Sequence, residues 1–345
     1  MTRDSQPNQG LRPLAGLSSK QGRPQRWLFL ACYAWVLGGA LTAAEPPLPG
    51  GLQAESLRVG FTRSAFLSVN RNDAEAAFRV FTRTVGQNRG YSIEATVQVF
   101  ENSTDLAPVL RDEGVNLLIL DTWTYLDLDA RDRLEPRFVS SDQGRVARRF
   151  LVLTRRNSGL GTLAELEGKS LNLLATANAE LGQRWLASVL QGQGLGDPAD
   201  FFGTIEPSPK PTTVVLPVFF GKKHACLIDS TGFELMTEMN PQVGKDLQTV
   251  VTSEPLVTAV ICLSAAGWSS DRFRRDLIEA LAELHLEPAG QQILTLFKTG
   301  QLMPFDESQL DTVRQLRAQA TAERLATRPG PDLTSARAAH ASVQP

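Results

Sequence analysis

The feature that most constrains this chain is a continuous apolar run at residues 115–121, VNLLILD. A run this short is typical of a strand in the middle of a parallel sheet, where helices cover both faces. Two more strand patterns precede it, at residues 57–61 and 91–100, and the second of these alternates apolar with polar residues. Helical spacing separates the strands, with Asp73 expected to cap the first helix. Strand and helix patterns in this order predict an α/β unit.

A second α/β set begins at residues 170–176 (SLNLLAT) and includes the strand HACLID at residues 224–229. We expect the Pro- and Ser-rich residues 206–212 to form a loop within this set. Strand patterns at residues 148–156 and 256–264 lie on either side of it, and helical patterns follow to the end. The sequence therefore predicts two α/β lobes crossed twice by the chain, with a ligand cleft at the carboxyl ends of the strands.

The N-terminus predicts export. A basic, polar stretch precedes an uncharged run at residues 27–44 that ends in small residues, which is the pattern of a secretory signal. The run is nearly long enough to cross a bilayer, so an uncleaved anchor is the alternative. The expected organisation follows from these patterns: signal 1–44, linker 45–54, lobe I 55–150, lobe II 151–255, a return to lobe I at 256–326, and a disordered tail at 327–345.

Composition excludes several classes of protein. The whole chain carries 35 Lys and Arg against 37 Asp and Glu, so it has no basic excess with which to bind nucleic acid. Three cysteines exclude a disulfide-built scaffold, and three scattered histidines argue against a metal site. Export would permit a bridge between Cys226 and Cys262, although both lie in apolar strand patterns where cysteine is usually a free core residue. We expect no cofactor.

Three polar corners follow predicted strands. Because helix N-termini and hydroxyl groups bind anions, we predict ligand contacts at these corners, and an additional one from Lys210 in the Pro-rich loop. Each polar group could instead serve only as a helix cap, and Tyr125 could be a core aromatic. The corner residues are Asp121, Thr122, Thr124 and Tyr125; Thr176 and Asn178; and Asp229, Ser230 and Thr231.

The sequence contains no nucleophile elbow, P-loop, zinc-protease motif or dinucleotide-binding glycine motif after a strand. An enzyme is therefore a less favoured interpretation, and we predict no catalytic residue.

Several segments resemble the phosphate/phosphite/phosphonate-binding proteins of ABC transporters. They are VNLLILDTWTYLDL, ELEGKSLNLL, VVLPVFFGKKHACLIDSTGFELMTEMNPQVG and PAGQQILTLFKTGQLMPFDESQLDTVRQL, and together they span about residues 55–320. The resemblance implies a type II periplasmic-binding-protein fold whose two lobes close on a ligand by hinge bending.

The resemblance also implies site residues. Tyr125 matches a tyrosine that the family places after the third strand, and Asp229 matches an acidic residue that can accept a hydrogen bond from a protonated ligand oxygen. The family's Ser-Thr-x-Ser loop is here Ala175, Thr176, Ala177 and Asn178, so only the threonine is retained. This departure leaves the identity of the ligand open.

From the resemblance we expect a monomeric periplasmic protein that captures a small oxyanion for an ABC importer. The alternative is a sensory protein of the same fold that reports its ligand to a membrane kinase or cyclase.

Overall fold

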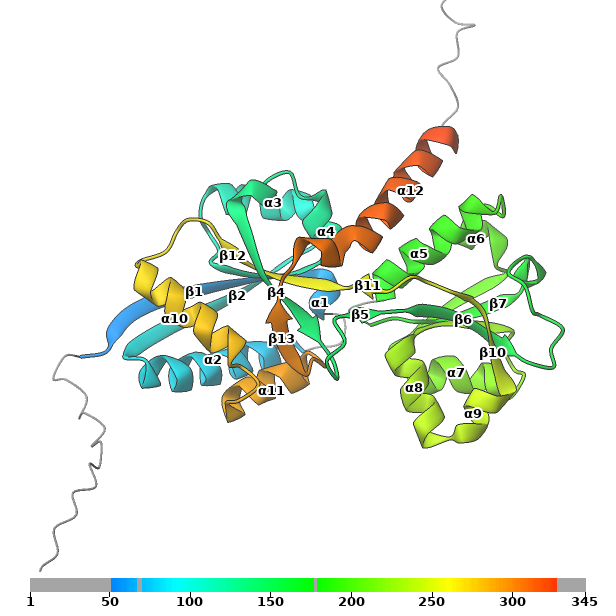
Figure 1. Ribbon diagram of the computed structural model, residues 1–345, viewed down its shortest axis with the longest axis horizontal. Coiled ribbons are helices and arrows are strands. Elements are labelled where there is room, and N and C mark those ends of the chain that lie inside the picture. The colour runs from blue at the N-terminus through cyan, green and yellow to red at the C-terminus, as the bar shows by residue number, and fades with distance from the viewer. Residues whose placement is uncertain (1–50, 67–69, 177–178, 328–345) are drawn as a thin grey trace, which may run out of the picture. The chain divides into compact units, whose positions relative to one another are not determined.

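The computed structural model describes residues 51–66, 70–176 and 179–327. Two sheets organise this part of the chain (Figure 1), with six strands in the order β13-β4-β12-β3-β1-β2 and five in the order β10-β6-β9-β7-β8. Asn178, the predicted signal at residues 1–44 and residues 328–345 of the predicted tail lie outside the described residues. Within the described ranges, no helix has the length and apolar character needed to cross a bilayer.

The first lobe is built on the six-stranded sheet. Its strands are β1 (Gln53–Thr62), β2 (Tyr91–Phe100), β3 (Leu117–Asp121), β4 (Leu134–Ser141), β12 (Ala259–Ser264) and β13 (Gln301–Pro304). Its helices are α1 (Arg63–Phe66), α2 (Arg71–Asn88), α3 (Ser103–Arg111), α4 (Thr122–Asp127), α10 (Asp271–Ala282) and α11 (Pro288–Leu296), with 3-10 turns η1 (Arg131–Arg133) and η3 (Glu307–Leu310). Helix α12 (Asp311–Thr327) follows η3 and contacts both α4 of this lobe and α5 (Ala179–Gly192) of the second. Figure 1 shows α3 and α4 on one side of this sheet and α2 and α11 on the other.

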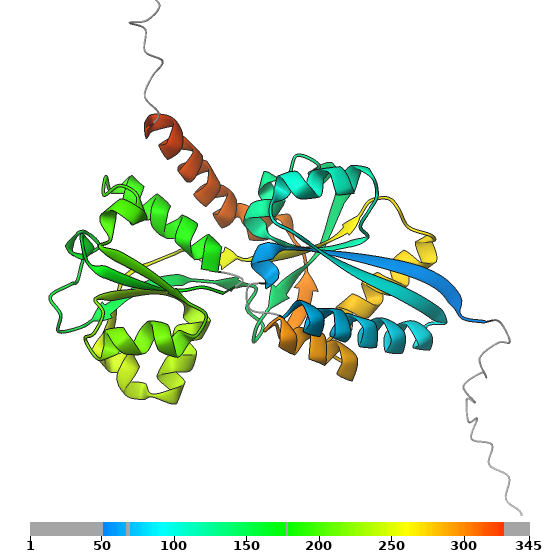
Figure 2. The same cartoon turned by 180° about the vertical axis from the view of Figure 1, so that it is seen from behind.

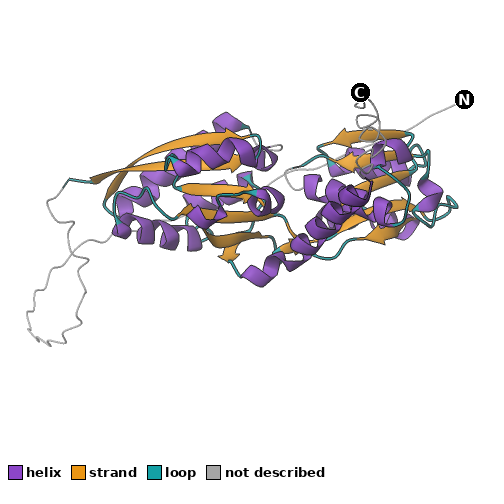
Figure 3. Cartoon of the chain, turned by 90° about the horizontal axis from the view of Figure 1, so that it is seen from above, coloured by secondary structure: helices purple, strands orange, loops and turns teal. Residues whose placement is uncertain are grey.

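The second lobe is built on the five-stranded sheet. Its strands are β6 (Phe150–Arg155), β7 (Ser170–Leu174), β8 (Thr204–Ser208), β9 (Ala225–Asp229) and β10 (Leu247–Thr252). Its helices are α5 (Ala179–Gly192), α6 (Pro198–Phe201), α7 (Pro211–Phe219), α8 (Ser230–Met239) and α9 (Pro241–Asp246), with the 3-10 turn η2 (Ala164–Leu166). Figure 2 shows the two sheets from behind, and Figure 3 shows their strands with the surrounding helices.

Two short strands carry the chain between the lobes. These are β5 (Ala147–Arg148) and β11 (Leu256–Val257), which pair antiparallel with each other. The fold is thus two α/β lobes joined by two crossing strands.

The apolar run that suggested a central strand is β3, and its two faces enter different cores. Leu118 and Leu120 pack into one cluster with side chains of α3 and α4, whereas Leu117 packs into another with side chains of α2, α10 and α11. Because strand side chains alternate between faces, burial on both faces requires an apolar residue at nearly every position.

Two local predictions were wrong. Residues 206–212 were expected to form a loop. Residues 204–208 instead form the edge strand β8, which is parallel to β7. Pro207 is tolerated there because an edge strand has one side on which no ladder hydrogen bond is made. Asn70, not Asp73, caps α2, since its side chain accepts a hydrogen bond from the Asn72 backbone nitrogen at 2.8 Å.

Candidate functional site

The carboxyl ends of strands from both lobes line one pocket of about 600 Å³. In the first lobe β1 is parallel to β2 and β3, and in the second β7 is parallel to β8 and β9, so the ends of each set share one sheet edge. We call this the interlobe pocket. Its described lining is Thr62, Arg63, Ser64, Glu101, Asn102, Ser103, Asp121, Trp123, Thr124, Asp127, Ala175, Thr176, Ala179, Glu180, Gln183, Arg184, Arg317 and Thr321.

Asp121 lies at the centre of a hydrogen-bond network on the first-lobe wall. Its Oδ1 accepts from the Thr124 backbone nitrogen at 2.8 Å, which caps α4. Its Oδ2 accepts from the hydroxyls of Ser64 and Thr124, each at 2.8 Å. The Thr62 hydroxyl accepts from the Asp121 backbone nitrogen at 3.1 Å and lies 3.0 Å from the Ser64 hydroxyl. The network fixes the ends of β1 and β3 relative to each other.

Two helices of more than two turns begin at this pocket, one from each lobe. Asn102, the cap of α3, lines it together with Ser103, and Ala179 and Glu180 open α5 on the opposite wall. The first backbone N–H groups of a helix have no partner within the helix, and the helix dipole gives this end a partial positive charge. An anion between α3 and α5 would therefore meet favourable dipoles from both lobes.

The α5 side of the pocket depends on close packing in the second lobe. A Cβ atom at Gly182 would lie 2.4 Å from Cδ1 of Phe150 on β6. A glycine at this position lets α5 approach Phe150 and the sheet closely.

Charged side chains in the lining are mostly paired with one another. The Arg63 guanidinium lies 2.7 Å from Glu101, and Arg184 lies 2.6 Å from Glu180. Arg184 also lies over the Trp123 ring, 4.6 Å from its centroid. These pairs balance charge within the wall. The helix dipoles at the starts of α3 and α5 are consequently the main source of attraction for an anion in this pocket.

Of the residues predicted to contact ligand where β3 ends and α4 begins, some line the pocket and others lie in the core. Trp123 and Thr124 line the pocket, whereas Tyr125 is buried among core side chains and is not part of the pocket wall. Burial raises the pKa of Tyr125 to about 12. Thr122 is fully buried, and its hydroxyl donates to the Val257 carbonyl of β11 at 2.8 Å. Residues three apart share a helix face, so Tyr125 follows Thr122 inward.

The other predicted contacts of the second lobe lie at the same sheet edge as Thr176 but outside the described lining of the interlobe pocket. Asp229 is buried and caps α8, accepting from the Gly232 backbone nitrogen at 2.8 Å, and Arg148 Nη1 lies 4.0 Å from its Oδ1. The Ser230 backbone nitrogen donates to the Arg149 carbonyl at 2.8 Å. Thr231 follows in the first turn of α8, and Lys210, exposed, precedes α7.

Sequence reasoning missed the corner after β1. Thr62 and Ser64 follow the first predicted strand directly, so the rule used for the other three corners could have found them. Arg317 had no comparable signal. It reaches the pocket from α12, where it donates to the Leu126 carbonyl at 2.5 Å and to Asp127 at 2.7 Å.

The two cysteines of the described chain are free and buried, as the apolar patterns predicted. They lie on strands of different sheets, Cys226 on β9 and Cys262 on β12. Burial raises the pKa of the Cys226 thiol to about 12 and raises that of Cys262 further. Within the described residues, no group of three or more His, Cys, Asp or Glu side chains could hold a metal ion.

Comparison with known proteins gives a family match over most of the chain. A family model described as "ABC transporter, phosphonate, periplasmic substrate-binding protein" matches residues 63–310. Among curated proteins, none matches this sequence.

Solved structures share the fold at low sequence identity. A Xanthomonas citri protein bound to ATP is 16% identical with a TM-score of 0.55, covering 79% of this chain and 100% of its own. A binding-protein component of an ABC phosphonate transporter from Pseudomonas aeruginosa is 14% identical with a TM-score of 0.54, covering 82% and 93%. PhnD1 from Prochlorococcus marinus, in complex with methylphosphonate, is 13% identical with a TM-score of 0.52, covering 77% and 98%.

Proposed function

This chain belongs to the phosphonate-type periplasmic substrate-binding proteins of ABC transporters. From that premise we propose that its ligand is a small phosphate-, phosphite- or phosphonate-like oxyanion, bound in the interlobe pocket. The observation that carries the proposal is the meeting of the N-termini of α3 and α5 at one pocket, from two different lobes. Each contributes about 0.3–1 kcal/mol toward an anion at an exposed site, and up to about 2 kcal/mol when partly buried.

The proposed contacts differ between the lobes. From the first lobe, the hydroxyls of Ser64 and Thr124 stand next to Asp121, whose carboxylate can accept from a protonated ligand oxygen. From the second lobe, the Thr176 hydroxyl and the start of α5 donate to the unprotonated oxygens. A fully ionised anion such as sulfate has no proton to offer Asp121, so the arrangement favours a phosphorus oxyanion.

We propose that hinge bending at β5 and β11 adds the remaining predicted contacts of the second lobe when the lobes close. The Asp229 corner adjoins the hinge, because the Ser230 backbone nitrogen bonds to Arg149, the residue after β5. Lys210 lies at the same sheet edge, after β8. These residues are then a second group of contacts, made only in the closed form.

Titration calorimetry of the full chain tests the proposal with phosphate, phosphite, methylphosphonate, aminoethylphosphonate and sulfate. We expect a phosphorus oxyanion to bind and sulfate to bind at least tenfold more weakly. Thr176→Ala removes a donor to a charged group, worth about 1.5–3 kcal/mol, and should weaken binding about tenfold or more. Thr96→Ala, on the exposed face of β2 and outside the interlobe pocket lining, is the matched control. Equal affinities of the two variants would contradict the proposed site.

The proposed partner is an ABC permease, to which a monomeric binding protein presents its closed form. No catalytic step is proposed. We also propose that residues 1–44 direct export and are removed. N-terminal sequencing of the exported protein tests this, and a chain that still begins at residue 1 would favour the membrane anchor.

A further inference from the structure

One contact at the edge of the interlobe pocket joins the two lobes directly. Trp123 lies on α4 of the first lobe, and the Arg184 guanidinium of α5 lies over its ring, 4.6 Å from the centroid. The Nε atom of Arg184 is buried and has no hydrogen-bond partner among the described residues. The ring face therefore stabilises this side of the cation, and a cation–π contact is stronger when the cation is shielded from water.

The lobes meet closely at this contact, although the pocket beside it is wide. A second space, of about 10 Å³, is lined by residues of both lobes and adjoins the interlobe pocket of about 600 Å³. A space of about 10 Å³ is at the lower limit of what one water molecule needs. The two lobes are therefore closely packed at this point. The residues that line both spaces are Asp121, Trp123, Glu180 and Arg184.

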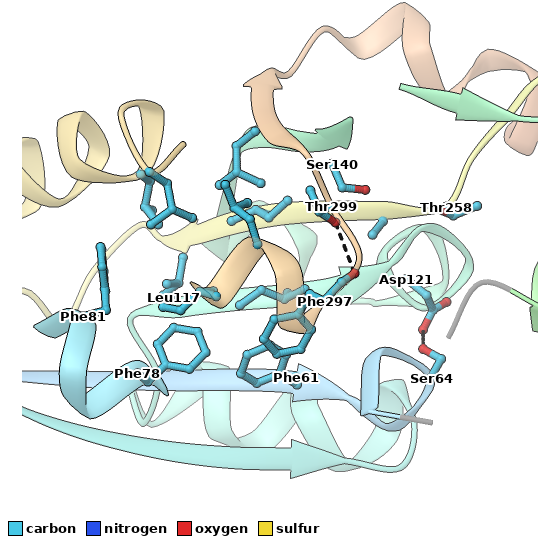
Figure 4. A pocket seen from close by; sticks show the side chains of 18 residues that line it. Phe61, Ser64, Phe78, Phe81, Leu117, Asp121, Ser140, Thr258, Phe297 and Thr299 are labelled. Atoms are coloured by element: carbon cyan, nitrogen blue, oxygen red, sulfur yellow. Dashed lines mark hydrogen bonds between the residues drawn. The ribbon is translucent and has the colours of Figure 1, made fainter. Parts of the chain in front are cut away.

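Trp123 is held in place by the start of its helix. Asp121 caps α4, and the Ser64 hydroxyl donates to its Oδ2 at 2.8 Å, as Figure 4 shows. Thr122, the residue before Trp123, donates its hydroxyl to a backbone carbonyl of β11 at 2.8 Å. The backbone that carries Trp123 therefore cannot follow the second lobe freely when the lobes separate.

Helix α12 packs against both of the helices that carry the contact (Figure 1). On the first-lobe side, Arg317 donates to Asp127 of α4 at 2.7 Å. On the second-lobe side, Leu316 belongs to the same core cluster as Trp185 of α5. One helix thus holds α4 and α5 next to each other.

We infer that Arg184 and Trp123 form a latch between the lobes, which keeps them together at the α5 side of the interlobe pocket in the ligand-free protein. The latch goes beyond the proposed function, because it concerns the ligand-free chain and does not depend on which ligand the pocket binds. A contact that stabilises one arrangement of the lobes shifts the population toward that arrangement. A cation–π contact changes such a ratio about two- to thirtyfold.

Distances between two spin labels, one on each lobe, test the inference by pulsed electron paramagnetic resonance of the full chain without ligand. The labels are attached at Thr84→Cys on α2 and Glu238→Cys on α8, both at exposed positions. Cys32→Ser removes the cysteine of the predicted signal, and the two remaining cysteines are buried. We expect Arg184→Met and Trp123→Leu each to raise the ratio of separated to latched molecules at least about threefold over the labelled parent.

Arg272→Met is the matched control. Like Arg184, Arg272 pairs with a carboxylate one helical turn away, and it also lies over an aromatic ring, 5.9 Å from the centroid of Tyr91. Both members of that contact belong to the first lobe. The loss of Arg272 should therefore leave the label distances unchanged.

A double variant distinguishes a latch from two side chains that act independently. If the two residues act through one contact, Arg184→Met should change the ratio less than about twofold when Trp123→Leu is already present. Effects that multiply in the double variant would overturn the inference, and so would label distances in the folded single variants that match those of the parent. An equal shift in Arg272→Met would also overturn it, because the shift would then not depend on a contact between the lobes. Thermal unfolding shows which single variants are folded, and one of them suffices for the comparison with the parent.

Discussion

Replacing Asp121 by alanine removes the carboxylate that fixes the first-lobe wall of the interlobe pocket. The change deletes the cap of α4, worth about 1 kcal/mol. It also deletes two hydroxyl bonds to a charged group, from Ser64 and Thr124, each worth about 1.5 kcal/mol at the lower end of the usual range. Together the cap and the two hydroxyl bonds are worth about 4 kcal/mol. Because the freed hydroxyls can bond to other acceptors or to water, we expect the free energy of unfolding to fall by about 3 kcal/mol.

Urea denaturation monitored by circular dichroism measures this loss. Asp121→Asn retains an oxygen for the Thr124 backbone nitrogen, and the hydroxyls can rotate to accept from its amide, so it should lose about 1 kcal/mol. Asp73→Ala is the matched control. It removes a carboxylate from the first turn of α2, where only the helix dipole is affected, and should lose at most about 1 kcal/mol.

The comparison can refute the reasoning directly. If Asp121→Ala costs no more than Asp73→Ala, the network at the ends of β1 and β3 does not hold this corner. Methylphosphonate affinity adds a functional readout on the same proteins. Asp121→Asn preserves the wall but loses the charge proposed to accept a hydrogen bond from a protonated ligand oxygen, so we expect a loss of only about 1 kcal/mol in stability with at least tenfold weaker binding.

Three further predictions concern the rest of the chain. Arg317→Ala breaks the half-exposed ion pair with Asp127 and should lower the free energy of unfolding by about 1 kcal/mol, measured by urea denaturation. Because the pKa of Tyr125 is raised to about 12 by burial, its contribution to stability is complete below about pH 10 and is lost as the pH rises toward 12. As the pH rises from 10 to 12, the free energy of unfolding of Tyr125→Phe should therefore fall less than that of the parent, again measured with urea. Cys226 and Cys262 should not react with a thiol reagent at pH 8 until the protein unfolds, and rapid labelling in native buffer would contradict their burial.

The sequence predicted the strands best where both sheet faces are covered. Residues 115–121 and 224–229 had to be apolar at nearly every position, and they form β3 and β9. It failed at β8 because an edge strand tolerates Pro207 and Ser208, whose residue types usually indicate a turn. It also gave no signal for β13, a four-residue strand that pairs with the distant β4, since such pairing depends on tertiary contacts.

The candidate site could be predicted by position but not by orientation. Corners after parallel strands were expected at one sheet edge, and Asp121, Thr124 and Thr176 do line the interlobe pocket. Successive side chains on a helix point about 100° apart, so neighbouring residues of α4 can face the pocket or the core. A six-residue helix is too short for its apolar pattern to show which residues face the core. Tyr125 was accordingly expected in the cleft and lies in the core.

Asp121 marks the point at which an apolar strand of the first lobe meets the polar interlobe pocket. Its carboxylate ends β3, whose preceding side chains Leu117 and Ile119 belong to the apolar core on the side of α2, α10 and α11. A strand that is apolar on both faces thus finishes in a group that must remain hydrogen-bonded, and the donors come from the two neighbouring helix starts, at Ser64 and Thr124. The boundary between the apolar core of the lobe and the interlobe pocket follows from this single change of residue type. A ligand without an anionic group would leave the partial positive charge at the starts of α3 and α5 without a partner.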